Sequence, residues 1–296
     1  MAKGIKLSDT DQFVTRGSKA DSYWNRNPYE PYYAKLRPGL KLPPELRGDL
    51  DKVLDKFQIK AVGFGNWLSV EDRINYVNAM IVAFYDLNKV LGFNYNVGIH
   101  KNLSVAFGAR GSGGALAHYE PANQIINITR YKRGDEHKAI RFLGSGGVGS
   151  FAHEYGHFLD YFAGQYLDKS NTVFALTDGR SVSRARVGVG GPIRQACDDL
   201  MEAIIWKEPG KELSSYYKRL LKFVEAVGKG DYFLRRNEIF ARAFEVYAKH
   251  ELGRRGIKNA FLTDTKYDPY YYLKESEMEK IAPKFRKLIK LIKDEI

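Results

Sequence analysis

His153, Glu154 and His157 are the residues whose types and spacing could perform chemistry, because they form the pattern His-Glu-x-x-His. Residues four apart lie on the same face of a helix, so both histidines can present an imidazole to one point. Glu154 lies beside that point and can take a proton from a water on a metal ion. Two imidazoles and an adjacent carboxylate therefore predict a site for one zinc ion, Zn2+.

The sequence around this pattern is typical of a buried helix. Ser150 is suited to the N-cap and Gly164 to the end of the helix. A buried helix gains nothing from two imidazoles and a carboxylate unless a partner satisfies them, which favours a metal over a purely structural pair. The apolar stripe that predicts burial consists of Phe151, Ala152, Tyr155, Phe158, Leu159 and Phe162.

A catalytic zinc also needs a third protein ligand, which the spacing alone does not identify. Glu238 is favoured because it opens an apolar helix, in which Ala241 is small enough to allow close approach to the active-site helix. Glu245, farther along the same helix, is the next carboxylate. The remaining histidines stay open as ligands: His100, His118, His137 and His250.

The elements that must position these residues are mixed. Residues 46–57 and 69–91 predict helices, and two short strands around the turn at 120–123 predict a hairpin. The C-terminal half is helical, with helices expected over 192–206, 213–227, from 237 onward and from Pro283 to Ile296. Residues 1–60 predict an extended Tyr- and Pro-rich arm followed by a short helix, and residues 61–296 one domain.

Composition limits the function classes. A hydrophobic content of 44% excludes wholesale disorder, and no apolar run is long enough for a transmembrane helix. The N-terminus lacks the apolar segment of a secretory signal, and a single cysteine excludes a disulfide framework. We therefore expect a cytoplasmic protein in a reducing cell interior. The net charge of +12 favours contact with nucleic acid, or serves only solubility.

Several segments resemble known families. Residues 153–171 and Asn237 to Phe244 resemble the catalytic segment and the glutamate-ligand helix of the anthrax lethal factor-type gluzincins. Residues 107–111, 114–121, 126–129 and 149–154 are more closely similar to the large polyvalent protein-associated domain, a zincin-like domain in proteins of phages and conjugative elements. The resemblance implies an α+β, zincin-like fold: a twisted, mostly antiparallel sheet, an active-site helix and a helical C-terminal half.

The resemblance also implies roles for individual residues. It supports Glu238 as the third zinc ligand, and Tyr232 matches the tyrosine that donates to the oxyanion. It makes the edge strand the substrate-binding segment, assigned to Ala115, Leu116, Ala117, His118 and Tyr119. Beside the ligands, Asp160 and Glu245 could orient the histidines, and Arg242 could pair with Glu238 four residues away.

Three functions are compatible with these residues. The first is a zinc-dependent endopeptidase, encoded by a phage or mobile element, that hydrolyses a protein or peptide substrate; the intact Glu154 favours it. The second is a non-catalytic protein that keeps the fold and binds DNA or travels in a virion; the positive charge favours it. The third is hydrolysis of a non-peptide amide, because the zinc-water chemistry does not choose the substrate.

Overall fold

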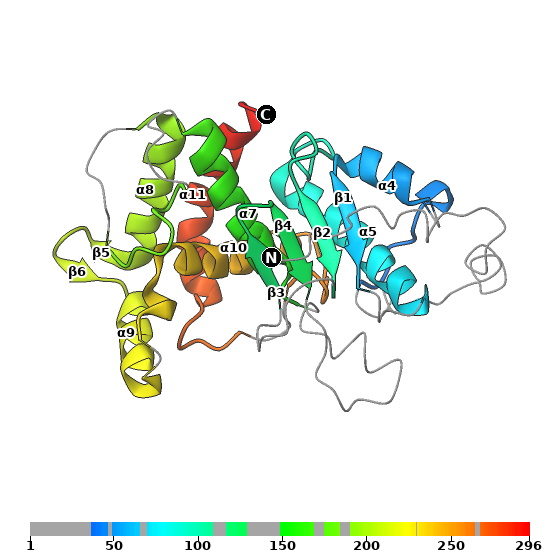
Figure 1. The fold of residues 1–296 in the computed structure, drawn as a ribbon. Coiled ribbons are helices and arrows are strands. Elements are labelled where there is room, and N and C mark those ends of the chain that lie inside the picture. The colour runs from blue at the N-terminus through cyan, green and yellow to red at the C-terminus, as the bar shows by residue number, and fades with distance from the viewer. Residues whose placement is uncertain are drawn as a thin grey trace, which may run out of the picture. The chain divides into compact units, whose positions relative to one another are not determined.

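The computed structural model describes residues 37–46, 49–65, 70–108, 117–128, 149–168, 175–183, 190–228, 230–263 and 267–296. The chain divides into two compact units, 1–151 with 255–264 and 152–254 with 265–296. The fold of the described residues is mixed α+β (Figure 1). None of the described helices is long and apolar enough to cross a membrane. The predicted domain boundary at residue 60 stays a prediction.

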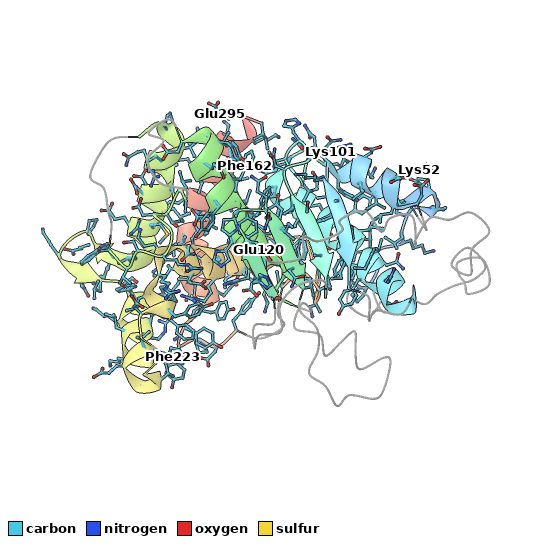
Figure 2. All side chains as sticks on the ribbon, viewed as in Figure 1. Lys52, Lys101, Glu120, Phe162, Phe223 and Glu295 are labelled. Carbon is cyan, nitrogen blue, oxygen red and sulfur yellow. The ribbon has the colours of Figure 1, made fainter. Side chains whose placement is uncertain are left out.

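The first unit contains a four-stranded sheet in the order β1-β2-β4-β3 (Figure 1). The strands are β1 (Ala61–Phe64), β2 (Ser104–Phe107), β3 (Ala117–Glu120) and β4 (Ile125–Ile128). The hairpin predicted around residues 120–123 is confirmed, since β3 and β4 pair antiparallel with His118 opposite Asn127. Strand β3 forms one edge of the sheet, and Glu120 at its end is labelled in Figure 2.

The expectation of a mostly antiparallel sheet is wrong for these four strands. Strand β2 pairs parallel with both β1 and β4, so only the β3–β4 pairing is antiparallel. Every residue of β2 and β4 is buried, as expected for central strands covered on both faces. Sequence reasoning missed β1, whose four residues are too few to display an alternating pattern.

Two helices accompany the sheet in this unit. Helix α4 (Leu50–Phe57) begins where the Asp49 side chain accepts a hydrogen bond from the Lys52 backbone N–H. It follows a short 3-10 turn, η1 (Pro44–Leu46). Helix α5 (Val70–Leu91) runs close to its predicted bounds, and its residues from Tyr76 to Phe84 are buried. Polar side chains on a buried helix must find hydrogen-bond partners within the protein, because water does not reach them.

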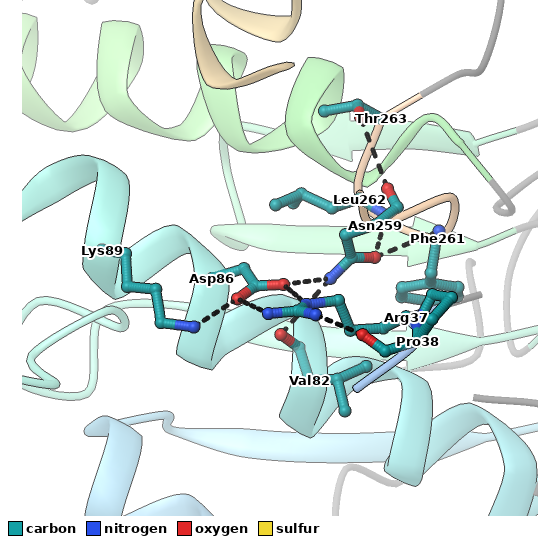
Figure 3. A network of polar contacts seen from close by, with 9 residues as sticks. All are labelled: Arg37, Pro38, Val82, Asp86, Lys89, Asn259, Phe261, Leu262 and Thr263. Atoms are coloured by element: carbon teal, nitrogen blue, oxygen red, sulfur yellow. Dashed lines mark hydrogen bonds and ion pairs between the residues drawn. The ribbon is translucent and has the colours of Figure 1, made fainter. Parts of the chain in front are cut away.

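One buried carboxylate on α5, that of Asp86, joins three distant segments (Figure 3). Its Oδ2 accepts hydrogen bonds from Arg37 Nε at 2.6 Å and from Asn259 Nδ2 at 3.0 Å. Its Oδ1 accepts from Lys89 Nζ at 2.8 Å. Asp86 is fully buried, so its negative charge depends on these donors. Through Asn259, the segment that follows residue 254 is held on this unit.

The second unit is mainly helical. Helix α7 (Phe151–Phe162) continues into a π-helical turn, η2 (Ala163–Leu167). Helix α8 (Pro192–Ile205) leads through the short ribbon of β5 (Trp206–Glu208) and β6 (Glu212–Leu213) to α9 (Ser215–Val227). The 3-10 turn η3 (Tyr232–Leu234) precedes α10 (Arg236–Gly253), and α11 (Glu275–Lys293) packs on α8 and α10. The predicted helices of the C-terminal half are therefore present.

The predicted start of the last helix at Pro283 is wrong, because α11 begins at Glu275 and Pro283 lies inside it. The Lys274 backbone N–H donates to the Glu277 carboxylate at 2.9 Å, which fixes the earlier start. An internal proline removes one helical hydrogen bond. Burial of the apolar residues on both sides of Pro283 offsets that loss: Met278, Ile281, Phe285 and Leu288 are each 5% exposed or less.

We expect Asp86→Asn to lower the free energy of unfolding by about 3–5 kcal/mol, because Arg37 would keep a buried charge without its counterion. Asp55→Asn is the matched control. Asp55 pairs with Lys101 (labelled in Figure 2), but its side chain is 70% exposed, so the cost should stay within about 1 kcal/mol. Urea unfolding of both variants measures the difference. Equal costs would contradict a stabilising role for the Asp86 network.

Candidate metal centre

Helix α7 presents His153 and His157 from the same face. Their ring centroids lie 4.9 Å apart at an interplanar angle of 82°. The opposite stripe, including Phe151, Tyr155 and Phe158, is fully buried, which fixes the rotation of the helix. His157 is 7% exposed and His153 is half-buried. The helical spacing therefore places both imidazoles together, as the sequence predicted.

Helix α10 brings Glu238 to these histidines by packing closely on α7. A Cβ atom at Gly156 would lie 3.1 Å from Ala241 Cα and 3.2 Å from Phe244 Cβ. Such contacts are tighter than ordinary packing distances, so the two helix backbones approach at a glycine. The small Ala241 lies at this crossing, as predicted. Glu238 lies in the first turn of α10, one turn before the crossing.

The segment between η2 and α8 fixes the first turn of α10. Backbone oxygens of Gly179 and Ser181 accept from the N–H groups of Asn237 at 3.0 Å and Arg236 at 2.9 Å. The Thr177 carbonyl accepts from Arg236 Nε at 2.8 Å. The first N–H groups of a helix need partners from outside it, and this segment supplies them. The backbone that carries Glu238 is thereby held in place.

The three side chains converge on one point. Glu238 Oε1 lies 3.6 Å from His157 Nε2, and Glu238 Oε2 lies 3.6 Å from His153 Nε2. One ligand atom from each residue lies within 4.8 Å of the others, the one such group found among the described residues. Ligands of a tetrahedral zinc ion are about 3.4 Å apart, so small side-chain shifts would complete the shell.

Two atoms of this cluster are buried without a hydrogen-bond partner: Glu238 Oε2 and His157 Nδ1. An unsatisfied buried carboxylate oxygen is costly unless a cation or a donor approaches it. Two imidazole nitrogens and a carboxylate oxygen form a ligand set that zinc prefers. The residues present therefore fit a zinc ion.

The charges around the cluster are coupled. Burial lowers the pKa of His153, but the carboxylates of Glu238, Glu245 and Glu154 outweigh it and raise the pKa to about 10. Burial and the positive His153 lower the pKa of His157 to about 3. Burial raises the pKa of Glu238, but the histidines and Arg242 outweigh it and lower the pKa to about 2. The carboxylates thus hold a positive charge at this point, as they would hold a cation.

Glu154 and Tyr232 both lie near the ligands. Glu154 is 6% exposed, and its carboxylate raises the pKa of His153 and of Tyr232. Burial, the Glu238 charge and a hydrogen bond with Glu238 raise the pKa of Tyr232, so its phenol keeps its proton. The Tyr232 ring remains 41% exposed. The predicted base and oxyanion donor are therefore both beside the cluster.

Glu245 and Arg242 surround the ligands as predicted. Glu245 Oε2 lies 3.7 Å from His153 Nδ1, on the side of the imidazole opposite Glu238. Arg242 Nη1 lies 3.7 Å from Glu238 Oε2, and its Nη2 donates to the Phe233 carbonyl. Glu245 therefore lies behind a ligand, and the geometry favours Glu238 over Glu245 as the third ligand.

Asp160 has a different place from the one predicted. Its carboxylate accepts from the Thr177 N–H at 2.8 Å and the Thr177 hydroxyl at 2.7 Å. His157 Nδ1 has no hydrogen-bond partner, so Asp160 does not orient that histidine. Through Thr177, Asp160 instead holds the segment that fixes the first turn of α10. It thereby positions Glu238.

The other described histidines have contacts of their own. His118 Nε2 is 3.2 Å from Glu120 Oε1 in the first unit, and His100 contacts Asn96 there. His250 contacts Glu275 at the end of α10. Ala115, Leu116 and His137 lie outside the described residues. Ala117, His118 and Tyr119 form the edge strand β3, and its role in substrate binding stays a prediction.

The structure adds two residues that the sequence did not indicate. Arg180 lies close enough to His157 to lower its pKa. Tyr272 donates a hydrogen bond to Glu245 Oε2 at 3.1 Å. Neither stands at a fixed spacing from the His-Glu-x-x-His pattern, so no local signal could have identified them. Both come from segments whose positions depend on tertiary packing.

Two grooves in the second unit are separate from the cluster. One, of about 530 Å3, lies among α8, α9 and α11 and is lined by residues such as Trp206, Tyr216 and Lys284. The other, of about 400 Å3, is lined by Tyr217, Leu213 and Arg236 among others. Neither is lined by His153, His157 or Glu238.

The comparisons with known proteins support the resemblance to the large polyvalent protein-associated domain in part, because the match does not include the segments between residues 107 and 154 on which that resemblance is based. Residues 225–296 match the family described as large polyvalent protein-associated domain 1. This part of the chain is therefore similar to that family. The matched segment includes Tyr232, Glu238 and Glu245 and spans both α10 and α11. No curated protein and no solved structure matches the chain.

We expect alanine at His153, His157 or Glu238 to remove most bound zinc, because each substitution leaves two protein ligands. His250→Ala is the matched control, since this histidine contacts Glu275 outside the cluster. Elemental analysis of the purified variants measures zinc per chain. Full zinc retention in Glu238→Ala would exclude Glu238 from the ligand set.

We expect Gly156→Ala to weaken zinc binding on the order of tenfold, because the added methyl group pushes Glu238 away from the histidines. Gly253→Ala is the control on α10, where a Cβ atom would meet nothing within 4 Å. Competition with a chromophoric chelator measures both affinities. Unchanged affinity in Gly156→Ala would contradict the close helix crossing as the feature that sets the site.

Proposed function

We propose that this chain is a zinc-dependent endopeptidase that hydrolyses peptide bonds, with His153, His157 and Glu238 as zinc ligands. The observation that carries the proposal is the convergence of these three side chains beside the buried Glu154. A structural zinc site has no use for an additional carboxylate at that position. The sequence resemblance supports an origin in a phage or mobile element, and the family match includes the helix that carries Glu238.

Zinc bound by these ligands supplies Lewis-acid chemistry, lowering the pKa of a water molecule and polarising a carbonyl group. Glu154 takes the proton of the attacking water and passes it to the leaving amine. The Tyr232 phenol donates a hydrogen bond to the oxyanion as the carbonyl carbon becomes tetrahedral. Its raised pKa keeps this phenol protonated, as a donor must be.

A second candidate is a non-catalytic protein that binds nucleic acid. The observation that favours it is the positive charge of α11, whose exposed residues include Lys280, Arg286, Lys287, Lys290 and Lys293. Arg286 and Lys287 are partly neutralised by Glu251 and Asp199. Nucleic-acid binding by this charge gives no role to Glu154 or Tyr232. The peptidase proposal gives both residues a role and therefore accounts for more of the site.

We expect Glu154→Gln to reduce peptide cleavage by about 100- to 10,000-fold while zinc remains bound, because the base is lost and the ligands are not. Tyr232→Phe should cost about 3 kcal/mol of transition-state stabilisation, which is about 160-fold in rate and near the lower end of that range. Cleavage of a proteome-derived peptide library, followed by mass spectrometry, measures both.

Tyr270→Phe serves as the control for Tyr232→Phe, since the Tyr270 side chain is 60% exposed. Cleavage that is equal in wild type and Glu154→Gln, with zinc bound in both, would contradict the peptidase. The non-catalytic candidate would then be the better explanation.

A further inference from the structure

We propose that Tyr272 is a positioning residue for the metal ligand His153 and acts through Glu245. The inference rests on the proposed zinc site and adds a residue to it. The Tyr272 hydroxyl donates to Glu245 Oε2 at 3.1 Å, and the same oxygen lies 3.7 Å from His153 Nδ1. Tyr272, Glu245 and His153 are thus connected by a series of polar contacts. They come from the segment before α11, from α10 and from α7.

The two ring nitrogens of His153 face different carboxylates. Its Nε2 faces Glu238 in the ligand cluster, and its Nδ1 faces Glu245. A metal-binding imidazole needs one nitrogen free for the metal, while the other donates its proton to a fixed acceptor. Glu245 is the carboxylate placed for that role, 3.7 Å from His153 Nδ1. Movement of its carboxylate would change the orientation of the His153 ring.

Glu245 needs a second partner to stay in place. It is only 2% exposed, and a buried carboxylate is stable where donors hold it. Tyr272 provides such a donor from outside α10. Burial and the Glu245 charge raise the pKa of Tyr272, so the phenol stays protonated and donates at neutral pH.

Aromatic packing fixes the Tyr272 ring. It stacks on Tyr267 with centroids 4.6 Å apart, and the Tyr271 ring lies 5.1 Å away. Tyr271 in turn packs on Phe223 (labelled in Figure 2), with the ring centroids 4.9 Å apart. A ring held by such neighbours keeps its hydroxyl at one place. The donor is therefore preorganised before a metal binds.

The test measures zinc affinity in the full-length protein by competition with a chromophoric chelator. Losing the hydrogen-bond partner of a metal ligand typically lowers metal affinity about 10- to 100-fold. Tyr272 contacts Glu245 and not the ligand itself, so Tyr272→Phe should weaken zinc binding about three- to tenfold. Tyr270→Phe, at an exposed neighbouring position, should have no effect. In a Glu245→Gln background, Tyr272→Phe should cause no further loss, because its effect passes through Glu245.

Two further readouts separate positioning from general stability. Thermal unfolding of metal-free Tyr272→Phe shows that the variant is folded at the temperature of the zinc measurement. The 15N shift of His153 Nδ1 in the zinc-bound protein should differ from that of wild type and of Tyr270→Phe. Wild-type zinc affinity in Tyr272→Phe, or an equal loss with and without Glu245, would overturn the proposal. A wild-type chain that binds no zinc would overturn it together with the metal site. Peptide cleavage is not measured, so a zinc protein without peptidase activity leaves this result standing.

Discussion

The close packing of α7 on α10 is the constraint on which the candidate site depends. Gly156 and Ala241 allow the helix backbones to approach, and only then does Glu238 face both imidazoles. Asp160 and Thr177 secure the same approach from the other end, because they hold the segment that binds the first turn of α10. Burial and geometry therefore bring the candidate metal ligands together.

Electrostatics explains why these residues stay together without a hydrogen bond between the histidines and Glu238. Charged groups of both signs share the cluster: His153 and Arg242 are positive, and Glu154, Glu238 and Glu245 are negative. Opposite charges offset part of the cost of burying one another, and one carboxylate oxygen remains without a donor. Such a cluster suits a cation, and the proposed function is based on that property.

Much of the site could be predicted from the sequence because its signals are local. Helical periodicity places His153 beside His157, and the small Ala241 indicates a close approach of two helices. Non-local features could not be predicted in this way. The parallel pairing of β2 with β1 and β4, the start of α11 before Pro283, and the binding of Asp160 to Thr177 all depend on contacts between distant segments. Tyr272 is another such residue, since only tertiary packing brings it to Glu245.

X-ray absorption at the zinc edge tests the central claim most directly, because it identifies the atoms bound to the metal in the intact protein. The account predicts a first shell of two imidazole nitrogens and one carboxylate oxygen, completed by a light oxygen atom, at about 2.0–2.2 Å. The Glu238→Ala variant should hold little zinc, whereas Tyr270→Phe should give the wild-type spectrum at full zinc content. A shell with a single imidazole, a sulfur ligand, or full zinc content in Glu238→Ala would contradict the account.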